Sequence, residues 1–375
     1  MKIGILTLPL ADNYGGILQA VALYRYLCKE GHEVTLIYKD NYEVLWKKIV
    51  INILLKIPFH NFKNIKSNQL ILDKWKARKD FHRPFVEKEI FTISKNLYTK
   101  KDLEKFSLKE GFDAVIVGSD QVWRKAYIND IYYKSYFLDF LDGKKTKKIA
   151  YAASFGKNHW EGEGDESIIC KLLNDFTAVS TREVSGIDIC KKSFDFNNVS
   201  NVLDPTAIIG KEFYLDKIIA KYDVSNISKN CLLTYVLDEA KEKQEIIEYF
   251  KKELTTSNLN HLKGFNKSES IFTVPEWLAS IYYCDFLVTD SFHGMIFSII
   301  FEKEFIVIGN KERGLDRFSS LLSLLDLEER LIFNVKDLKN KDIDRIDYKK
   351  VNKVLNDYKN KSLNYLNCSL SGINK

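Results

Sequence analysis

Cysteine is scarce in this sequence, and the cysteines that it has are far apart. None of the six forms a C-x-x-C pair with another; they are Cys28, Cys170, Cys190, Cys231, Cys284 and Cys368. This spacing argues against a disulfide framework and against a structural zinc site, and no cluster of histidine, cysteine and carboxylate residues indicates a metal. We therefore expect no metal, and a reducing, cytoplasmic compartment fits the sequence best. Proline is also rare, with five residues, but no function follows from that.

The sequence also lacks a signal peptide and an apolar run long enough to cross a membrane. Its start, MKIGILTLPLADNYGG, has no basic leader, apolar centre or small-residue cleavage site. Residues 41–69 mix lysines with an apolar run that is far shorter than the roughly 20 residues of a membrane span. Two interpretations of this segment stay open. It is either a helix that rests on an anionic membrane, at its inner face, or a helix that covers the protein's own core or cleft.

Neither sign of charge dominates the sequence. A formal net charge of +6 over 375 residues is modest and is not concentrated in one block. A mildly basic globular enzyme explains it, and we expect no nucleic-acid partner. The length exceeds the size at which a single hydrophobic core usually stops growing, so two domains are the first expectation. None of these features indicates an oligomeric state.

Short apolar runs rich in β-branched residues recur along the chain, and each is followed by turn residues and a helix-like segment. They begin at Lys2, Glu33, Asp113, Lys147, Thr177, Cys231, Asp285 and Glu304. Continuous apolar runs of this kind are typical of parallel strands that helices bury on both faces. The alternation predicts two doubly wound α/β units, with a boundary between residues 201–206 (NVLDPT) and Cys231. After them, residues 346–375 have the spacing of a terminal amphipathic helix.

The first helix is expected directly after the first apolar run, in NYGGILQAVALYRYLCKEG. Asn13 is placed to cap it and Gly31 to end it, while Gly15 and Gly16 leave room for ligand atoms beside the backbone. A strand, a glycine turn and a helix N-terminus suit an anion or sugar hydroxyls, so Asn13, Tyr14 and Gly15 are candidate substrate-binding residues. A purely structural turn explains the glycines equally well. The spacing is not the G-x-G-x-x-G of a dinucleotide site, so NAD and FAD are not indicated.

Polar residues follow several predicted strands, at the sheet edge where open α/β sheets bind ligands. In VGSDQVW, Ser119, Asp120 and Gln121 come directly after a strand. Asp120 is suited to accept a proton from a substrate hydroxyl, with Gln121 as a substrate contact, but an aspartate here could equally cap a helix. Trp123 is also open to two interpretations, stacking on a sugar or filling the core.

Positively charged residues follow other predicted strands. Arg182, in STREVSG, offers a planar fork of donors for carboxylate or phosphate, unless it pairs with a structural carboxylate such as Glu183. In VTDSFHG, His293 can donate a proton near neutral pH or hold a phosphate, and Ser291 lies beside it at a helix start. Further cations follow the next strand in GNKERGLDRF, namely Lys311, Arg313 and Arg317. Together they predict a ligand that carries both phosphate and carboxylate.

The same motifs carry a resemblance to a known family. ADNYGGILQA, FDAVIVGSDQVW, KKIAYAASFG, STREVSG, VLDPT and VTDSFHGMIFSIIF resemble, in that order, the polysaccharide pyruvyl transferase family over roughly residues 1–335. The resemblance implies a glycosyltransferase-B-like fold of two Rossmann-like domains facing a cleft, with residues 1–205 on the acceptor side and 206–345 on the phosphoenolpyruvate side. It also implies transfer of pyruvate from phosphoenolpyruvate onto two hydroxyls of a sugar in a surface or exopolysaccharide precursor. The products would be a cyclic ketal and phosphate.

The resemblance also implies roles for individual residues. It places the family's phosphoenolpyruvate-binding arginine and histidine on Arg182 and His293, with a further cation among residues 311–317. Phosphoenolpyruvate is then the donor substrate, without another cofactor, and the acceptor is a glycan or a lipid-linked oligosaccharide. Because C3 of the donor must be protonated, we expect His293 to donate this proton or to hold the departing phosphate. Asp120 is the candidate base for the acceptor hydroxyl.

The sequence departs from the family pattern at two places. Arg124 and Lys125 replace the usual Asn-Pro after GSDQVW, which leaves the identity of the acceptor open, and Glu304 stands where proline is common, at a strand entrance. Two other classes of function also remain open. One is a nucleotide-sugar glycosyltransferase, since fold does not fix function, and the other is a non-catalytic partner in polysaccharide assembly.

Overall fold

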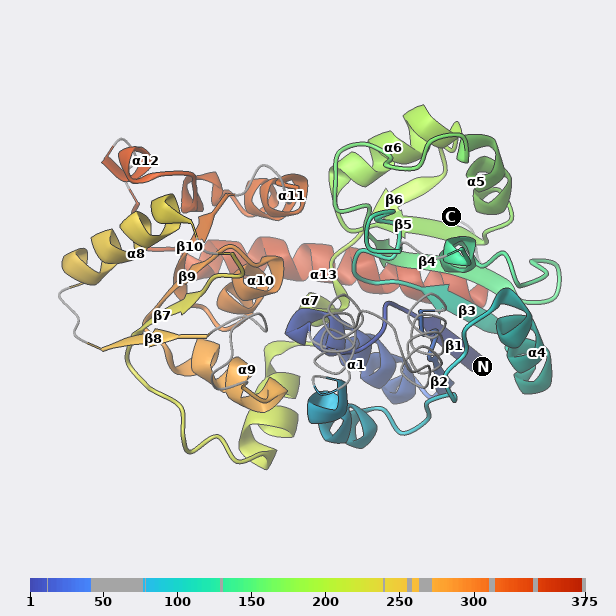
Figure 1. Cartoon of the computed structure of the whole chain (residues 1–375), viewed down its shortest axis with the longest axis horizontal. Helices are drawn as coiled ribbons and strands as arrows, with labels where there is room; N and C mark the ends of the chain where they lie inside the picture. The colour runs from blue at the N-terminus through green and yellow to red at the C-terminus, as the bar shows by residue number, and fades with distance from the viewer. Residues whose placement is uncertain are drawn as a thin grey trace, which may run out of the picture.

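The computed structural model describes residues 1–11, 13–41, 77, 79–128, 131–238, 240–254, 258–262, 272–309, 314–339 and 343–372. Within these ranges the chain forms two parallel β-sheets with helices around them, and the two sheets lie side by side (Figure 1). Each of the eight predicted apolar runs contains a strand. The two predicted α/β units are therefore confirmed.

All neighbouring strands in both sheets are parallel. The first sheet has the order β2-β1-β3-β4-β5-β6. Its strands are β1 (Lys2–Leu6), β2 (Glu33–Ile37), β3 (Ala114–Val117), β4 (Lys147–Ala153), β5 (Ala178–Thr181) and β6 (Val199–Asn201). The second sheet has the order β11-β10-β9-β7-β8. Its strands are β7 (Leu232–Tyr235), β8 (Leu259–His261), β9 (Phe286–Thr289), β10 (Glu304–Ile308) and β11 (Leu331–Ile332).

Helices connect the strands, and capping residues explain where two of them begin. Thr99 with Asp102 forms a capping box at α4, and Thr273 with Glu276 forms one at α9. The helices of the first half are α1 (Tyr14–Lys29), α4 (Lys100–Glu110), η1 (Tyr133–Phe137), α5 (Glu166–Leu173), α6 (Val184–Phe194), α7 (Pro205–Ile208), η2 (Phe213–Ile218) and η3 (Ile219–Lys221). Those of the second half are α8 (Lys241–Glu253), α9 (Val274–Tyr283), α10 (Phe292–Ile300), α11 (Asp316–Leu324), η5 (Glu328–Arg330), α12 (Val335–Lys339) and α13 (Tyr348–Ser371).

The two sheets share one topology. Counted from its own first strand, each sheet contains the order 2-1-3-4-5, so the chain leaves in opposite directions from β1 and β3, and from β7 and β9. Open parallel sheets bind ligands at the carboxyl ends of the strands at such a switch point. Asp120 follows β3 and His293 follows β9, so both lie at a switch point.

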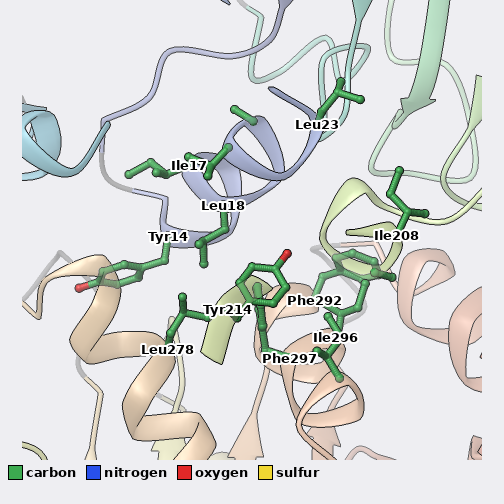
Figure 2. Packing of buried hydrophobic residues seen from close by; sticks show 14 of the residues in the cluster. Tyr14, Ile17, Leu18, Leu23, Ile208, Tyr214, Leu278, Phe292, Ile296 and Phe297 are labelled. Atoms are coloured by element: carbon green, nitrogen blue, oxygen red, sulfur yellow. The ribbon is translucent and has the colours of Figure 1, made fainter. Parts of the chain in front are cut away.

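One buried hydrophobic cluster contains side chains of both domains, beside a further cluster within each domain. Side chains of α1, such as Tyr14 and Leu18, pack with Leu278 of α9 and Phe297 of α10 in one buried cluster (Figure 2). The ring of Tyr14 stacks on Trp277, with a centroid distance of 5.4 Å and an interplanar angle of 11°. Because these side chains are almost wholly buried, separating the two domains would expose a large apolar surface. The shared core therefore fixes how the two sets of strand ends face each other.

Helix α13 runs across both domains (Figure 1, red). At its first residue, the Tyr348 hydroxyl donates to the carbonyl of Lys303, beside β10. Further along, Ser362 Oγ accepts from the backbone N–H of Leu203 at 3.0 Å, and the Tyr365 hydroxyl donates to the carbonyl of Ala150 in β4 at 3.2 Å. The predicted terminal helix is present, and it ties the second domain back to the first.

Glu304 has a structural role at the start of β10. Its carboxylate accepts from Arg330 Nη1 at 2.8 Å and from the backbone N–H of Ile346 at 2.9 Å. These bonds connect β10 to the segment that leads into α13. The two interpretations of residues 41–69 concern a segment outside the described residues, apart from Asn41. Within the described ranges, none of the helices combines the length and the apolar character needed to span a bilayer.

Candidate functional site

The carboxylate of Asp120 is buried between Asn13 and Arg182. No helix follows Asp120, so the alternative that it caps one is excluded. Its Oδ2 accepts from Asn13 Nδ2 at 3.1 Å, and its Oδ1 lies 3.5 Å from Arg182 Nη2. Asp120 has a φ of +66°, a left-handed conformation that aspartate tolerates better than most residues and that often marks a functional position. Asn13 begins α1, but its side chain makes no cap and serves Asp120 instead.

Arg182 follows β5 and is buried at the centre of the site. Its Nη1 donates to Asp204 Oδ2 at 2.8 Å, and its guanidinium lies 4.4 Å from the ring centroid of Phe292, a residue of the other domain. Its Nε and Nη2 atoms have no hydrogen-bond partner among the described residues. Burial alone would lower the pKa of Arg182, but Asp204, Asp120 and Glu183 outweigh it and raise that pKa. The guanidinium is therefore positively charged, and its Nε and Nη2 can still donate hydrogen bonds to a ligand.

Asp204 connects most of the other groups, and the sequence reasoning missed it as a site residue. Its Oδ1 accepts from the backbone N–H and the hydroxyl of Thr206, at 3.0 and 2.8 Å, which caps α7. Its Oδ2 accepts from Ser119 Oγ at 3.0 Å as well as from Arg182. Burial tends to raise the pKa of Asp204, but His293, Arg182 and the Thr206 N–H together hold it well below its usual range. The Asp-Pro step after β6 was the available signal, since it places a helix cap at a strand end.

His293 lies in the first turn of α10 and reaches across to the first domain. Its imidazole packs against the backbone of Gly15, because a Cβ placed on Gly15 would lie 1.9 Å from both Cγ and Nδ1. Its Nε2 is 3.7 Å from Asp204 Oδ2, too far for a hydrogen bond, and has no hydrogen-bond partner among the described residues. The space beside Gly15, predicted for a ligand, is thus occupied by the histidine, whose Nε2 remains the available atom.

The two polar residues before His293 serve the backbone rather than the site. Asp290 pairs with Lys243 Nζ at 2.5 Å and accepts from the backbone N–H of Leu237 at 2.8 Å. The hydroxyl of Ser291 accepts from the backbone N–H of Gly294 and caps α10. These contacts hold the β9–α10 turn in place. They direct His293 toward the first domain.

A second carboxylate and a second arginine complete the cluster. Glu183 accepts three hydrogen bonds at Oε1, from Ser154 Oγ at 2.9 Å and from the backbone N–H groups of Phe155 and Gly156 at 2.8 and 3.3 Å. Its Oε2 is 4.0 Å from Arg182 Nε, so the main partner of Arg182 is Asp204 rather than Glu183. Burial raises the pKa of Glu183. Burial, with the charge of Arg182, lowers the pKa of Arg317 to about 10.

Other predicted residues lie elsewhere. Tyr14 is in the shared core, where its hydroxyl donates to the carbonyl of Phe272 at 2.8 Å, rather than beside a ligand. Trp123 is fully buried and donates to the carbonyl of Tyr136, so it belongs to the core. Gln121 Oε1 accepts from Arg124 Nη1 at 2.9 Å. Lys311 and Arg313 lie outside the described residues.

The arrangement can bind a small anion and move protons around it. Arg182 and His293 offer three nitrogen atoms that make no hydrogen bond within the described residues, and Arg317 adds a cation 5.9 Å from the same Phe292 ring. Asp120 supplies a carboxylate on the first-domain side. Charge-assisted bonds from a planar arginine are well matched to carboxylate and phosphate groups.

Comparisons with known proteins bear on both fold and family. The S. aureus MnaA–UDP complex is similar in structure, with a TM-score of 0.53 at 12% identity over 100% of this chain and 98% of that chain. A UDP-N-acetylglucosamine 2-epimerase from Rickettsia bellii gives a TM-score of 0.52, also at 12% identity and with the same coverage. These similarities confirm the glycosyltransferase-B-like fold. A search of the curated proteins gives no match.

The family model for polysaccharide pyruvyl transferase matches residues 13–312. This range contains Asp120, Arg182, Asp204 and His293. Because the match covers most of the chain, the protein belongs to the polysaccharide pyruvyl transferase family.

Proposed function

We propose that this transferase moves pyruvate from phosphoenolpyruvate onto two hydroxyls of a sugar in a polysaccharide precursor, forming a cyclic ketal and releasing phosphate. One observation carries the proposal: Nε and Nη2 of Arg182 and Nε2 of His293 are buried nitrogen atoms without a hydrogen-bond partner among the described residues. Phosphoenolpyruvate is small and bears a carboxylate and a phosphate, the two groups that such donors bind best. The acceptor in this proposal is a glycan or a lipid-linked oligosaccharide.

On the donor side, Arg182 binds an oxyanion of phosphoenolpyruvate and His293 acts through Nε2. A proton from Nε2 goes to C3, which becomes the methyl group, and C2 becomes electron-poor. The carboxylate of Asp204 lies 3.7 Å from this nitrogen, so a negative charge faces the imidazole on the side of the first domain. If His293 holds the phosphate instead, the same Nε2 donates a hydrogen bond to the leaving group.

On the acceptor side, Asp120 takes the proton of the first sugar hydroxyl while that oxygen bonds to C2. The bond between C2 and the phosphate oxygen then breaks. The second hydroxyl oxygen closes the ring on C2, and its proton leaves with phosphate. The proton on Asp120 balances the one that His293 gave to C3, so the cycle needs no other acid or base. Asn13 and Arg182 hold the Asp120 carboxylate in position.

The first experiment tests the reaction itself. The protein is incubated with phosphoenolpyruvate and a panel of soluble and lipid-linked oligosaccharides, and mass spectrometry detects a pyruvate adduct while released phosphate is measured. We expect an adduct with at least one acceptor and phosphate in equal amount. If nucleotide sugars raise the melting temperature and donate a sugar while phosphoenolpyruvate does neither, the proposal is wrong.

The second experiment separates the two roles of His293. His293→Gln keeps a side-chain N–H that can hold phosphate but cannot transfer a proton, whereas His293→Ala loses both. If His293 is the proton donor, the two variants are equally inactive in phosphate release. If it is a phosphate clamp, the Gln variant retains much more activity than the Ala variant. Near-normal turnover in both would remove His293 from the mechanism.

A further inference from the structure

Arg124 is a buried cation without a carboxylate partner among the described residues. Only 8% of the residue is exposed. Its Nη1 donates to the neutral Gln121, and its Nε is buried without a hydrogen-bond partner. Other buried cations are paired: Arg182 with Asp204, Lys243 with Asp290. A buried charge that lacks a counter-ion destabilises the folded protein, which makes a ligand anion the natural partner.

The position of Arg124 places it at the edge of the proposed site. A Cβ on Gly156 would lie 2.9 Å from Arg124 Cδ, and one on Gly314, in the second domain, would lie 2.0 Å from the carbonyl oxygen of Gly156. Gly156 is also the residue whose N–H donates to Glu183, next to Arg182 in the chain. Arg124 therefore lies beside Gly156, where loops of the two domains are in contact. Through Glu183, the same loop contacts the residue next to Arg182.

The aromatic ring beside Arg124 is itself partly exposed to solvent. Its guanidinium lies 4.1 Å from the ring centroid of Tyr127, and Tyr127 is 51% exposed. Stacking on a ring leaves the edge of a guanidinium free for hydrogen bonds in its own plane. A ligand anion that approaches beside Tyr127 would meet the guanidinium at this edge, where Arg124 has no carboxylate partner among the described residues.

We propose that Arg124 binds an oxyanion on the acceptor, so that this chain modifies a glycan that already carries a phosphate or a carboxylate near the hydroxyls that receive pyruvate. The inference rests on the proposed function. Arg124 belongs to the acceptor side because it lies on the same loop as Asp120, the base for the acceptor hydroxyl. The donor has its own cations, Arg182 and Arg317, which flank Phe292, whereas Arg124 stacks on Tyr127.

A binding experiment tests the second anion site without knowledge of the acceptor. Isothermal titration calorimetry measures inorganic pyrophosphate binding to the full chain at saturating phosphoenolpyruvate. The variants are Arg124→Asn, Arg124→Gln and, as a control, Lys125→Asn, which removes the same charge one residue away. We expect one salt-sensitive pyrophosphate site in the wild type and in Lys125→Asn. Both Arg124 variants should lose it while their Kd for phosphoenolpyruvate stays unchanged.

Acceptor competition identifies the anion. Sugar phosphates, uronic acids and their neutral counterparts are compared as acceptors, and the ratio of kcat/KM for anionic over neutral acceptors should fall at least tenfold in the Arg124 variants. If sugar phosphates are the preferred acceptors, the group that Arg124 binds is a phosphate. If uronic acids are preferred, it is a carboxylate. The proposal is overturned if the Arg124 variants keep the second site and the preference, or if they lose phosphoenolpyruvate binding instead. If the wild type does not bind phosphoenolpyruvate, the proposed function is refuted. The comparison of pyrophosphate binding between the wild type and the Arg124 variants then still tests whether Arg124 binds an anion.

Discussion

Replacing Gly15 with alanine is expected to disable the site through a single methyl group. The new Cβ would lie 1.9 Å from Cγ and Nδ1 of His293 and 2.6 Å from its Cβ, whereas ordinary contacts begin at 3.4 Å. The imidazole must therefore retreat by about 1.5 Å. It cannot do so by turning its tip, because both the ring and its Cβ are in the way. A displacement of about 1 Å in a catalytic group can lower the rate about 100-fold, and overpacking typically destabilises a protein by about 1–3 kcal/mol.

Gly16→Ala is the matched control, one residue further along the same helix turn. Its Cβ would meet Asn13 Nδ2 at 3.0 Å and Asp120 Oδ2 at 3.2 Å, which are ends of side chains that can give by a few tenths of an ångström. Neither glycine has a positive φ, so alanine fits the helix at both positions and gains up to about 1 kcal/mol in helix propensity. We expect Gly16→Ala to keep most of its phosphate release from phosphoenolpyruvate.

The assay for the pair combines phosphate release, melting temperature and the NMR signals of the histidine rings. The chain has only six histidines, so the ring nitrogens of His293 can be assigned from the His293→Gln variant. Gly15→Ala should shift the His293 signals and abolish turnover, while Gly16→Ala should leave the signals in place. If Gly15→Ala turns over normally with unchanged His293 signals, then the imidazole does not occupy the space beside Gly15 and the described site geometry is refuted.

Three further predictions follow from the same contacts. Arg182→Lys keeps the charge but not the fork, so kcat/KM for phosphoenolpyruvate should fall about 100- to 1000-fold in the phosphate-release assay, and an unchanged value would exclude Arg182 from donor binding. Asp204→Asn should lower the free energy of unfolding at neutral pH by about 3–5 kcal/mol in urea titrations, because it removes the main counter-ion of the buried Arg182. The pKa of Asp204 is lower in the folded than in the unfolded protein, so its carboxylate stabilises the fold above about pH 4 and this contribution is lost as the pH falls below that value. The stability of Asp204→Asn should consequently depend less on pH in this acid range, and an unaltered pH dependence would contradict the assignment. Tyr14→Phe removes the hydrogen bond to the carbonyl of Phe272 and should lower the free energy of unfolding by about 1 kcal/mol without changing turnover. An unchanged free energy of unfolding with lost turnover would instead indicate that Tyr14 binds substrate.

The buried strands could be predicted from the sequence because both of their faces are covered. Continuous apolar runs leave no other interpretation at that length, and all eight proved to contain strands. The edge strands β6, β8 and β11 were missed because they have only two or three residues, too few to give a recognisable apolar run. Their formation depends on the neighbouring strand rather than on their own sequence.

Predicting the site had a different limit. Residues directly after buried strands, such as Asp120, Arg182 and His293, can be found from topology alone. For Asp204 the Asp-Pro step indicates only a helix cap at a strand end, because its role in the site comes from contacts with three segments that the sequence does not show to be close together. The same holds for Gly15, whose missing side chain admits a histidine nearly 280 residues later in the chain rather than a ligand. Sequence spacing reports which residues share a strand end, but not which strand ends meet.

Helix α13 has a consequence for the order in which the molecule assembles. It is synthesised after both sheets, yet Tyr365 and Ser362 bond to the first domain, and Leu366 lies in the core beneath it. During translation the first domain therefore waits with an uncovered apolar face until residues 348–371 have left the ribosome. We expect chaperones to bind this apolar face of the nascent first domain, and the packing of α13 to complete the core that both domains share.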